Sequence, residues 1–173
     1  MLIKGIRLIL ACAPGFCRHW YTDAALLRQV LDNLLVNALK FCDDGVVALV
    51  ARPGPARRLF LHVLDQGPGV MAGDRRRIFR PGQRGRSHSG VPGSGLGLAV
   101  CHRNVSLLAG RIRCTGMPHG GSCFSVALPT ALHEDDRFDA RLPALAALRY
   151  RLEIDPPLNG LLRLMCESSG FGE

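Results

Sequence analysis

Three features that define familiar protein classes are missing or scarce in this sequence. Its seven cysteines form no C-x-x-C pair and are odd in number, which argues against a zinc site and against a disulfide framework. Its longest apolar runs, such as residues 8–13, are far shorter than the ~20 residues that cross a bilayer. Aromatic residues make up 6% of the chain, too few to indicate the stacking platform of a single-strand nucleic-acid binder. We therefore expect a reduced, cytoplasmic protein that contacts neither membrane nor nucleic acid.

The length and the charge of the chain narrow the choice further. With 173 residues, of which 47% are hydrophobic and 21% charged, the chain can form one globular domain, or one domain and a fragment. Residues 1–129 carry 17 basic and 6 acidic side chains, whereas residues 130–173 carry 5 and 8. The basic surplus of the first part suits an anionic partner, such as a nucleotide, a nucleic acid or an acidic protein face.

Hydrophobic periodicity and turn residues predict mixed strands and helices as far as Pro129. Thr22 and Asp23 supply an N-cap for the longest helix, and Gly110 closes the second helix. The glycine-rich stretch 80–94 is predicted to be a mobile loop. The predicted elements are a strand over 3–12, a helix over 24–42, a hairpin of strands 46–51 and 59–64, a helix over 96–108, and a hairpin of strands 111–115 and 122–128.

Four polar side chains form a stripe along the first predicted helix. Gln29, Asn33, Asn37 and Lys40 lie at i, i+4, i+8 and i+11, so they share one face of that helix. Asparagine is a mediocre helix former, and its amide oxygen is a ligand that Mg²⁺ accepts. The stripe therefore indicates a metal site with Lys40 near a phosphate. A solvated polar face is the alternative interpretation.

An acidic residue and two glycines follow the predicted strand 59–64. Asp65 precedes Gly67 and Gly69, and glycines let a flat ligand approach the backbone closely. An ionised carboxylate accepts hydrogen bonds but does not donate them, so it suits the exocyclic amine of adenine and rejects the keto oxygen of guanine. An ordinary turn rich in glycine and proline is the alternative.

A glycine triplet stands where the predicted loop enters the second helix. Gly93, Gly95 and Gly97 have the spacing G-x-G-x-G, which is neither the dinucleotide fingerprint nor a Walker A motif. Free backbone N–H groups and the helix dipole make such a junction a candidate anion site.

In their order and spacing, these motifs resemble the ATP-binding domain of sensor histidine kinases, which belongs to the GHKL superfamily. The resemblance covers roughly residues 4–129. It implies an α/β fold, the GHKL (Bergerat) two-layer sandwich, in which helices cover one face of a mixed sheet and a flexible ATP lid spans about 81–94. The matching segments are the N box (27–41), the G1 box (65–69), the F box (77–81), the G2 box (93–98) and a closing hairpin (110–112 and 121–129).

The resemblance also implies roles for individual residues. Asn37, with help from Asn33, is expected to coordinate Mg²⁺, and Lys40 to lie beside the nucleotide; these three are the expected catalytic residues. Asp65 is expected to accept the adenine amine, and the backbone N–H groups of the G2 box to bind the phosphates. The other expected contacts to the nucleotide are Phe41, Gly67, Gly69, Val70, Phe79, Gly93, Ser94, Gly95, Leu96, Gly97, Leu98 and Cys123.

The sequence departs from the family pattern in two places. Gly82, Gln83 and Arg84 follow the F box where an aromatic continuation is usual, and Cys123 stands where threonine is common near the adenine. Neither departure removes an expected contact to Mg²⁺ or to the phosphates, so ATP binding is still expected.

By this resemblance, the protein binds Mg-ATP and transfers the γ-phosphoryl group to a histidine on a separate dimerisation domain. A response-regulator receiver domain is the further expected partner, and the isolated chain is expected to be monomeric because it carries no dimerisation helices. The alternatives are a stand-alone GHKL protein-serine kinase and a non-catalytic nucleotide-binding interaction module. The arginines clustered around residues 75–86 suggest nucleic-acid binding as a further hypothesis, but no recognised nucleic-acid-binding motif supports it.

The composition changes after Pro129. We expect an ATP-binding domain over 1–129, a charged linker over 130–143 and, over 144–173, a fragment that faintly resembles the first strand and helix of a receiver domain. One such unit is too short to bury a receiver core, so the tail is expected either to pack poorly or to dock on the ATP-binding domain. His133 in the linker is a weak candidate for the phosphoacceptor.

Overall fold

A computed structural model of the chain describes residues 5–13, 20–55, 58–83, 94–129 and 131–132. Three predicted features lie wholly or mostly outside these residues. They are most of the ATP lid, the candidate phosphoacceptor His133 and the receiver-like tail 144–173.

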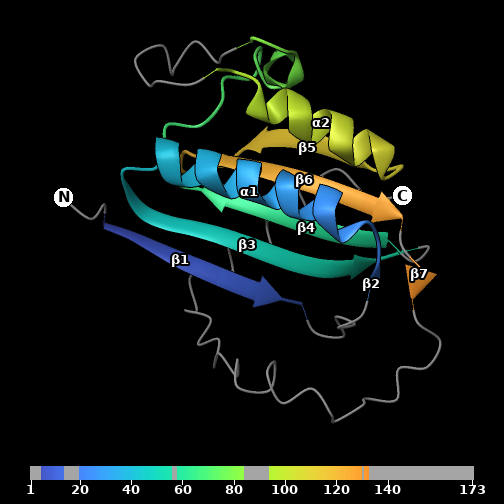
Figure 1. Ribbon diagram of the computed structural model, residues 1–173. Coiled ribbons are helices and arrows are strands. Elements are labelled where there is room, and N and C mark those ends of the chain that lie inside the picture. Colours follow the sequence, from blue (N-terminus) through green and yellow to red (C-terminus); the bar gives the residue numbers. More distant parts are fainter. Residues whose placement is uncertain (1–4, 14–19, 56–57, 84–93, 130, 133–173) are drawn as a thin grey trace.

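A five-stranded mixed sheet forms the centre of the fold, with the strand order β1-β3-β4-β6-β5 (Figure 1). β1 runs parallel to β3, and the pairs β3–β4, β4–β6 and β5–β6 are antiparallel. Both predicted hairpins are thereby confirmed. The strands span Gly5–Cys12 (β1), Asp44–Gly54 (β3), Arg58–Asp65 (β4), Arg111–Gly116 (β5) and Ser122–Pro129 (β6).

The long helix α1, Ala24–Phe41, begins where the sequence predicts it. The Oδ1 atom of Asp23 accepts hydrogen bonds from the backbone N–H groups of Ala25 and Leu26, each at 3.0 Å, and so satisfies two donors of the first turn. Val30, Leu34 and Ala38 are spaced by four residues and form the buried stripe that packs on the sheet.

The second helix, α2, spans Gly97–Leu107 and ends differently from the prediction. Ala109, not Gly110, takes the left-handed conformation, with a φ of 53°. The N–H groups of Ala109 and Gly110 bond to the carbonyls of Ser106 and Val105, which is the Schellman pattern of a helix end. Gly110 is required for another reason: a Cβ atom there would lie 2.5 Å from Cδ2 of Leu128 on β6.

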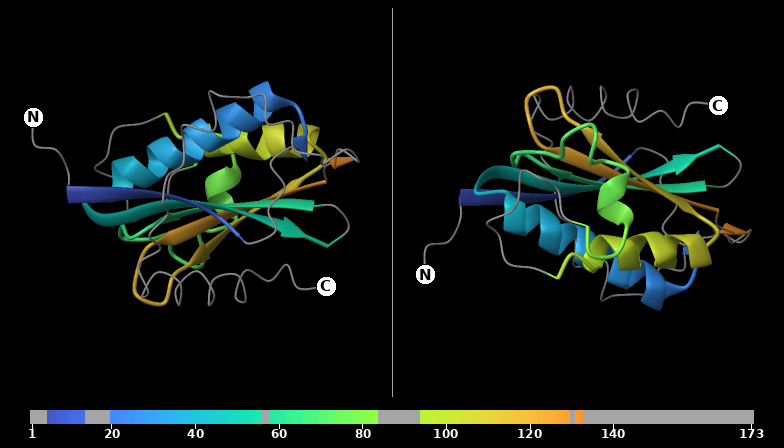
Figure 2. Two further views of the ribbon diagram at one scale, coloured as in Figure 1. Left: turned by 90° about the horizontal axis from the view of Figure 1, so that it is seen from below. Right: turned by 90° about the horizontal axis from the view of Figure 1, so that it is seen from above.

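Both helices lie on the same face of the sheet, as the edge-on views show (Figure 2). The main core fills the space between them and the sheet, and it includes Leu34 of α1, Val105 of α2 and Val126 of β6. This arrangement confirms the predicted two-layer α/β sandwich. No helix in the described part of the chain is long and apolar enough to cross a membrane.

Two short elements were not predicted. A single 3-10 turn, η1, spans Arg77–Phe79, and a two-stranded antiparallel ribbon joins β2, Trp20–Tyr21, to β7, Ala131–Leu132. β7 follows β6 in the chain but pairs with β2, which precedes α1.

Candidate functional site

A pocket of about 260 Å³ opens between α1, the end of β4, the start of β6 and the N-terminus of α2. The structure brings together residues from all the motifs that the sequence singled out. The predicted residues that line the pocket are Asn33, Asn37, Lys40, Phe41, Asp65, Gly69, Val70, Ser94, Gly95, Gly97 and Leu98.

The α1 wall of the pocket carries the two asparagines of the polar stripe. Asn33 and Asn37 lie one helical turn apart and both line the pocket, while Lys40 holds its ammonium group 5.3 Å from the centre of the Phe41 ring. Among the described residues, no three His, Cys, Asp or Glu side chains gather into a metal-binding cluster. The amide oxygens of Asn33 and Asn37, together with oxygens of a ligand, could hold a divalent cation such as Mg²⁺, which keeps several non-protein ligands.

Gln29 does not share this role, although the sequence places it on the same stripe. Its Oε1 atom accepts a hydrogen bond of 2.6 Å from Nδ2 of Asn104, a buried residue of α2. Further along the two helices, the Cys101 thiol approaches the Val30 carbonyl at 3.6 Å, and a Cβ atom on Gly97 would lie 3.3 Å from Oδ1 of Asn33. Gln29 thus ties α2 to α1 in a register that places the start of α2 beside Asn33.

Asp65 is a buried carboxylate in the pocket lining, at the end of β4. Its Oδ1 atom accepts the Gly67 N–H at 2.9 Å, and its carboxylate also accepts a backbone N–H from Ser122. Burial raises the pKa of Asp65 because it penalises the charged form, and these two backbone hydrogen bonds oppose that shift. A carboxylate that is 5% exposed and lines a cavity can select a ligand that donates a hydrogen bond.

The two glycines after Asp65 allow close packing of the loop. A Cβ atom on Gly67 would lie 2.6 Å from the Phe41 carbonyl oxygen, so a side chain there would push the loop away from α1. Gly69 has a φ of +74°, and a Cβ atom there would lie 2.7 Å from the Gly121 carbonyl oxygen. Gly67 therefore supports the pocket wall without lining it, whereas Gly69 does both.

The N-terminus of α2 closes the opposite side of the pocket. Ser94, Gly95, Gly97 and Leu98 line it, whereas Leu96 is half exposed and lies outside the lining. The Ser94 hydroxyl accepts a hydrogen bond from the Leu96 N–H at 3.4 Å. The Val100 N–H donates a helical hydrogen bond to the Leu96 carbonyl. The amides of the first turn thus lack helical partners, and this end of an eleven-residue helix suits an anionic group of a ligand. Gly93 lies outside the described residues.

Cys123 and Phe79 lie away from the pocket. Side chains alternate along β6, so Ser122 and Phe124 face the pocket while Cys123 points to the other side of the sheet. The residues of this strand that line the pocket are therefore Ser122 and Phe124, which flank the predicted Cys123. Phe79 packs edge-on against Phe124 at 6.3 Å and supports that ring from behind. The lining residues that the sequence did not indicate are Ala38, Ile78, Gln83, Ser122 and Phe124.

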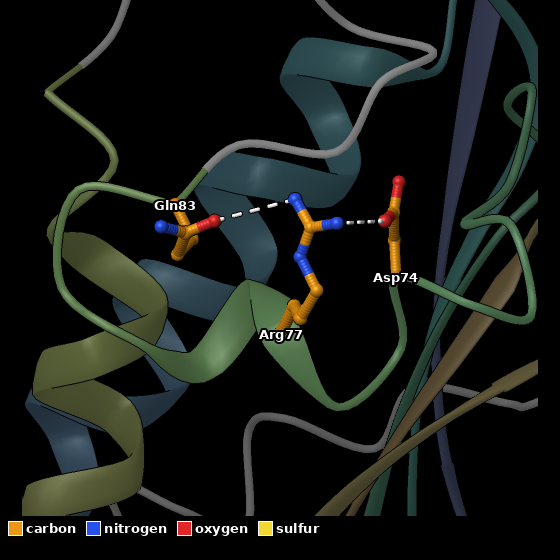
Figure 3. A network of polar contacts seen from close by, with 3 residues as sticks. All are labelled: Asp74, Arg77 and Gln83. Carbon is orange, nitrogen blue, oxygen red and sulfur yellow. Dashed lines mark hydrogen bonds and ion pairs between the residues drawn. The ribbon is translucent and has the colours of Figure 1, made fainter.

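Gln83 lines the pocket, and a chain of polar contacts with Arg77 and Asp74 holds it in place (Figure 3). Arg77 makes an ion pair of 3.4 Å with the buried carboxylate of Asp74 and donates a hydrogen bond of 3.3 Å to Oε1 of Gln83. A polar amide held by η1 thus stands at the pocket where the family pattern has an aromatic side chain.

The sequence matches the family described as "Histidine kinase-, DNA gyrase B-, and HSP90-like ATPase" over residues 22–132. The chain belongs to this family. Within the family its relatives are sensor kinases: it is 39% identical to the sensor protein KdpD of Escherichia coli over 109 residues, which are 63% of this chain and 12% of KdpD. It is also 36% identical to the virulence sensor protein BvgS of Bordetella bronchiseptica over 150 residues, which are 83% of this chain and 12% of BvgS.

Solved structures agree with the fold. Full-length ShkA in complex with AMPPNP superposes with a TM-score of 0.67 and 32% identity, covering 75% of this chain and 27% of ShkA. The catalytic domain of the histidine kinase ThkA has a TM-score of 0.63 and 21% identity, covering 73% of this chain and 80% of that domain, and supports the fold alone. The chain is thus a histidine-kinase ATPase domain of the sensor-kinase type, as its motifs indicated, and it spans about an eighth of the length of KdpD and BvgS.

Proposed function

We propose that the pocket binds ATP with Mg²⁺ and that this ATPase domain transfers the γ-phosphoryl group to a histidine on a separate dimerisation domain. The observation that carries the proposal is the meeting of Asp65, the Asn33–Asn37 pair and the start of α2 in one cavity. These groups suit the base, the metal and the phosphates of one nucleotide. The likeness to ShkA, which was solved with AMPPNP, supports the same assignment.

Each wall of the pocket has a distinct task in this proposal. Asp65 accepts the adenine amine, while Ile78 and Phe124 supply apolar walls for the ring. Asn33 and Asn37 would hold Mg²⁺, which when bound neutralises charge on the phosphates. The N–H groups of Gly97 and Leu98 donate to phosphate oxygens at the helix N-terminus.

The chemistry of Asn33 favours transfer to a protein side chain over hydrolysis. Related ATPases such as gyrase carry a glutamate at the matching position, which acts as a base on water. The neutral amide of Asn33 accepts hydrogen bonds but takes up no proton near neutral pH, so it cannot activate a water molecule in this way. Positioning and charge stabilisation then remain as the contributions of the domain to phosphoryl transfer.

The partners follow from this role. A dimerisation domain that carries the phosphoacceptor histidine and a receiver domain that accepts the phosphoryl group next are the proposed partners, and the chain alone is proposed to be a cytoplasmic monomer. Residues 144–173 are proposed to correspond to the first strand and helix of a receiver-like unit. The match to BvgS covers 83% of this chain, so it extends beyond the family match, which ends at residue 132.

Phosphoryl transfer can be tested with γ-labelled ATP, Mg²⁺ and the dimerisation domain of a related sensor kinase such as KdpD. We expect acid-labile label on the histidine of that domain, and loss of the label with Asn37→Ala. Asp32→Ala, on the exposed side of the same helix, is the matched control and should keep the label. Acid-stable label on serine would favour the protein-serine kinase, and nucleotide binding without transfer would favour the interaction module.

A further inference from the structure

The sheet has a second face, opposite α1 and α2, whose central residues are buried while its arginines on β4 and β5 are exposed. We call it the back face; it consists of the side chains that alternate with those of the main core along the strands. Nine of its residues are at most 6% exposed. They are Ala11, Ala48, Val50, Phe60, His62, Leu64, Cys123, Ser125 and Ala127.

Cross-strand register arranges these residues in rows. Val50, His62, Ser125 and Arg113 form one row across β3, β4, β6 and β5, and neighbouring rows contain Phe60 and Leu64. With strands ~4.8 Å apart and rows ~7 Å apart, the buried floor measures roughly 15 by 14 Å. A floor of this size must be covered by a packed segment, because bordering side chains cannot exclude water from its centre.

The buried polar side chains at the centre of the back face bond to one another. Nε of Arg52 donates to Nε2 of His62 at 3.1 Å, and Nδ1 of His62 lies 2.9 Å from the Ser125 hydroxyl. Burial and the neighbouring Arg52 lower the pKa of His62 to about 4, so the imidazole is neutral at neutral pH. A neutral, fully hydrogen-bonded histidine is what a dry interface between two layers requires.

The described residues do not supply the covering layer. Both helices lie on the other face (Figure 2), and the apolar side chains that border the back-face cluster are Ile9 and Val46 of the sheet and Met117 of the β5–β6 turn. Arg52 covers the Phe60 ring, 4.4 Å from its centre, but no more than that ring.

We propose that the C-terminal segment, residues 133–173, covers the back face and makes the fold three-layered. Its 41 residues exceed what the floor needs, since a ten-residue helix is ~15 Å long and ~10 Å wide. Residues 142–165 contain eight leucines, which can supply the apolar contact. The other undescribed segments have at most ten residues each, fewer than the C-terminal segment.

Charge complementarity favours the same occupant. Arg52, Arg58 and Arg111 lie on the back face toward the end where β6 finishes, and none of the described residues in register with them is acidic. The segment begins with an acidic cluster, Glu134, Asp135, Asp136 and Asp139, that starts five residues after Pro129, the partner of Arg58. Five residues span at most ~17 Å, so the cluster can reach these arginines.

Photo-cross-linking of the full chain tests the occupant directly. Photo-methionine replaces methionine with little change in shape, Met117 borders the back face, and the exposed Met71 provides a reference in the same molecule. We expect Met117 to cross-link to peptides of 133–173 within one chain, and Met71 to form no such links. Absence of these links from Met117 would overturn the proposal. So would links found mainly between differently isotope-labelled copies, because a second copy would then cover the face.

Cysteine alkylation tests the role of charge. In the full chain, Cys123 should react as slowly as the buried Cys101 and far more slowly than the exposed Cys12. Changing all four residues of the acidic cluster to lysine should speed the alkylation of Cys123 about tenfold and leave the alkylation rate of Cys101 unchanged. A tenfold change corresponds to a loss of about 1.4 kcal/mol of docking free energy. The matched control changes the other four acidic residues of the segment to lysine: Glu153, Asp155, Glu167 and Glu173. Equal effects of the two quadruple variants, or rapid alkylation of Cys123 in the unmodified chain, would contradict the proposal.

Discussion

Replacing Asp65 with asparagine should reverse the base preference of the pocket. The Asp65→Asn side chain has nearly the same shape, and its amide oxygen can keep the hydrogen bond from the Gly67 N–H that Oδ1 now accepts at 2.9 Å. The amide nitrogen then takes the place of an acceptor inside the pocket. A donor there opposes the amine of adenine and matches the keto oxygen of guanine.

The magnitude follows from the burial of this carboxylate. A hydrogen bond to a charged, buried acceptor contributes roughly 1.5–3 kcal/mol, so ATP should bind roughly 10- to 150-fold more weakly to Asp65→Asn. GTP should bind the variant more tightly than it binds the unmodified chain, since two facing acceptors no longer repel each other. The ratio of the two affinities should therefore change by more than either affinity alone.

The assay titrates Mg-ATP and Mg-GTP against each variant and measures binding by the displacement of a fluorescent nucleotide. Asp32→Asn is the control, because Asp32 lies on the exposed side of α1 and does not line the pocket. Circular dichroism and a urea titration establish that each variant is folded. An unchanged ATP-to-GTP ratio in folded Asp65→Asn, or the same change in Asp32→Asn, would refute the assignment of Asp65 to the base.

Three further predictions address the metal, the back face and a helix end. Asn37→Ala should weaken binding of Mg-ATP and reduce phosphoryl transfer further, because the metal neutralises charge that grows during transfer. A more stable helix with full activity would show that Asn37 is a solvated residue and not a metal ligand. The folded pKa of His62, about 4, lies below its ordinary value of 6.5, so the unfolded state binds more protons between these values. The contribution of His62 to the free energy of unfolding should thus be fully present above pH 6.5 and fall by about 2 kcal/mol on going to pH 5. Urea titrations at several pH values measure this fall, and the His62→Gln variant should lack it. Ala109→Gly should raise the free energy of unfolding by about 1 kcal/mol, because glycine accepts a φ of 53° without steric strain, whereas Ser106→Gly in the same turn should lower it.

The sequence predicts the layout of the fold because its signals are local. The Asp23 cap, the four-residue spacing of Val30, Leu34 and Ala38, and the alternation along β6 each depend on neighbours a few residues away. The motif order then identifies the family, which the match over residues 22–132 confirms. The pocket residues on α1, after β4 and at the start of α2 follow from these two steps.

The residues and strands whose place in the structure differs from what the sequence suggested have a different explanation. In a strand, an error of one position moves a side chain to the opposite face, which is why Ser122 and not Cys123 lines the pocket. Gln29 looks like part of the ligand stripe until α2 brings Asn104 within 2.6 Å, and these residues lie 75 positions apart. The two-residue strands β2 and β7 are too short for any periodicity, and their pairing depends on the three-dimensional fold.

A backbone NMR titration with Mg-ATP tests the central claim most directly, because it asks whether this pocket is the nucleotide site. Saturable shift changes should appear at the amides of Gly67, Gly69, Gly97 and Ser122, which border the pocket, and should be absent from His62 on the back face. Addition of Mg²⁺ to the ATP complex should then move the side-chain amide signals of Asn37. Absence of saturable changes, or changes centred on residues outside the pocket, would contradict the account.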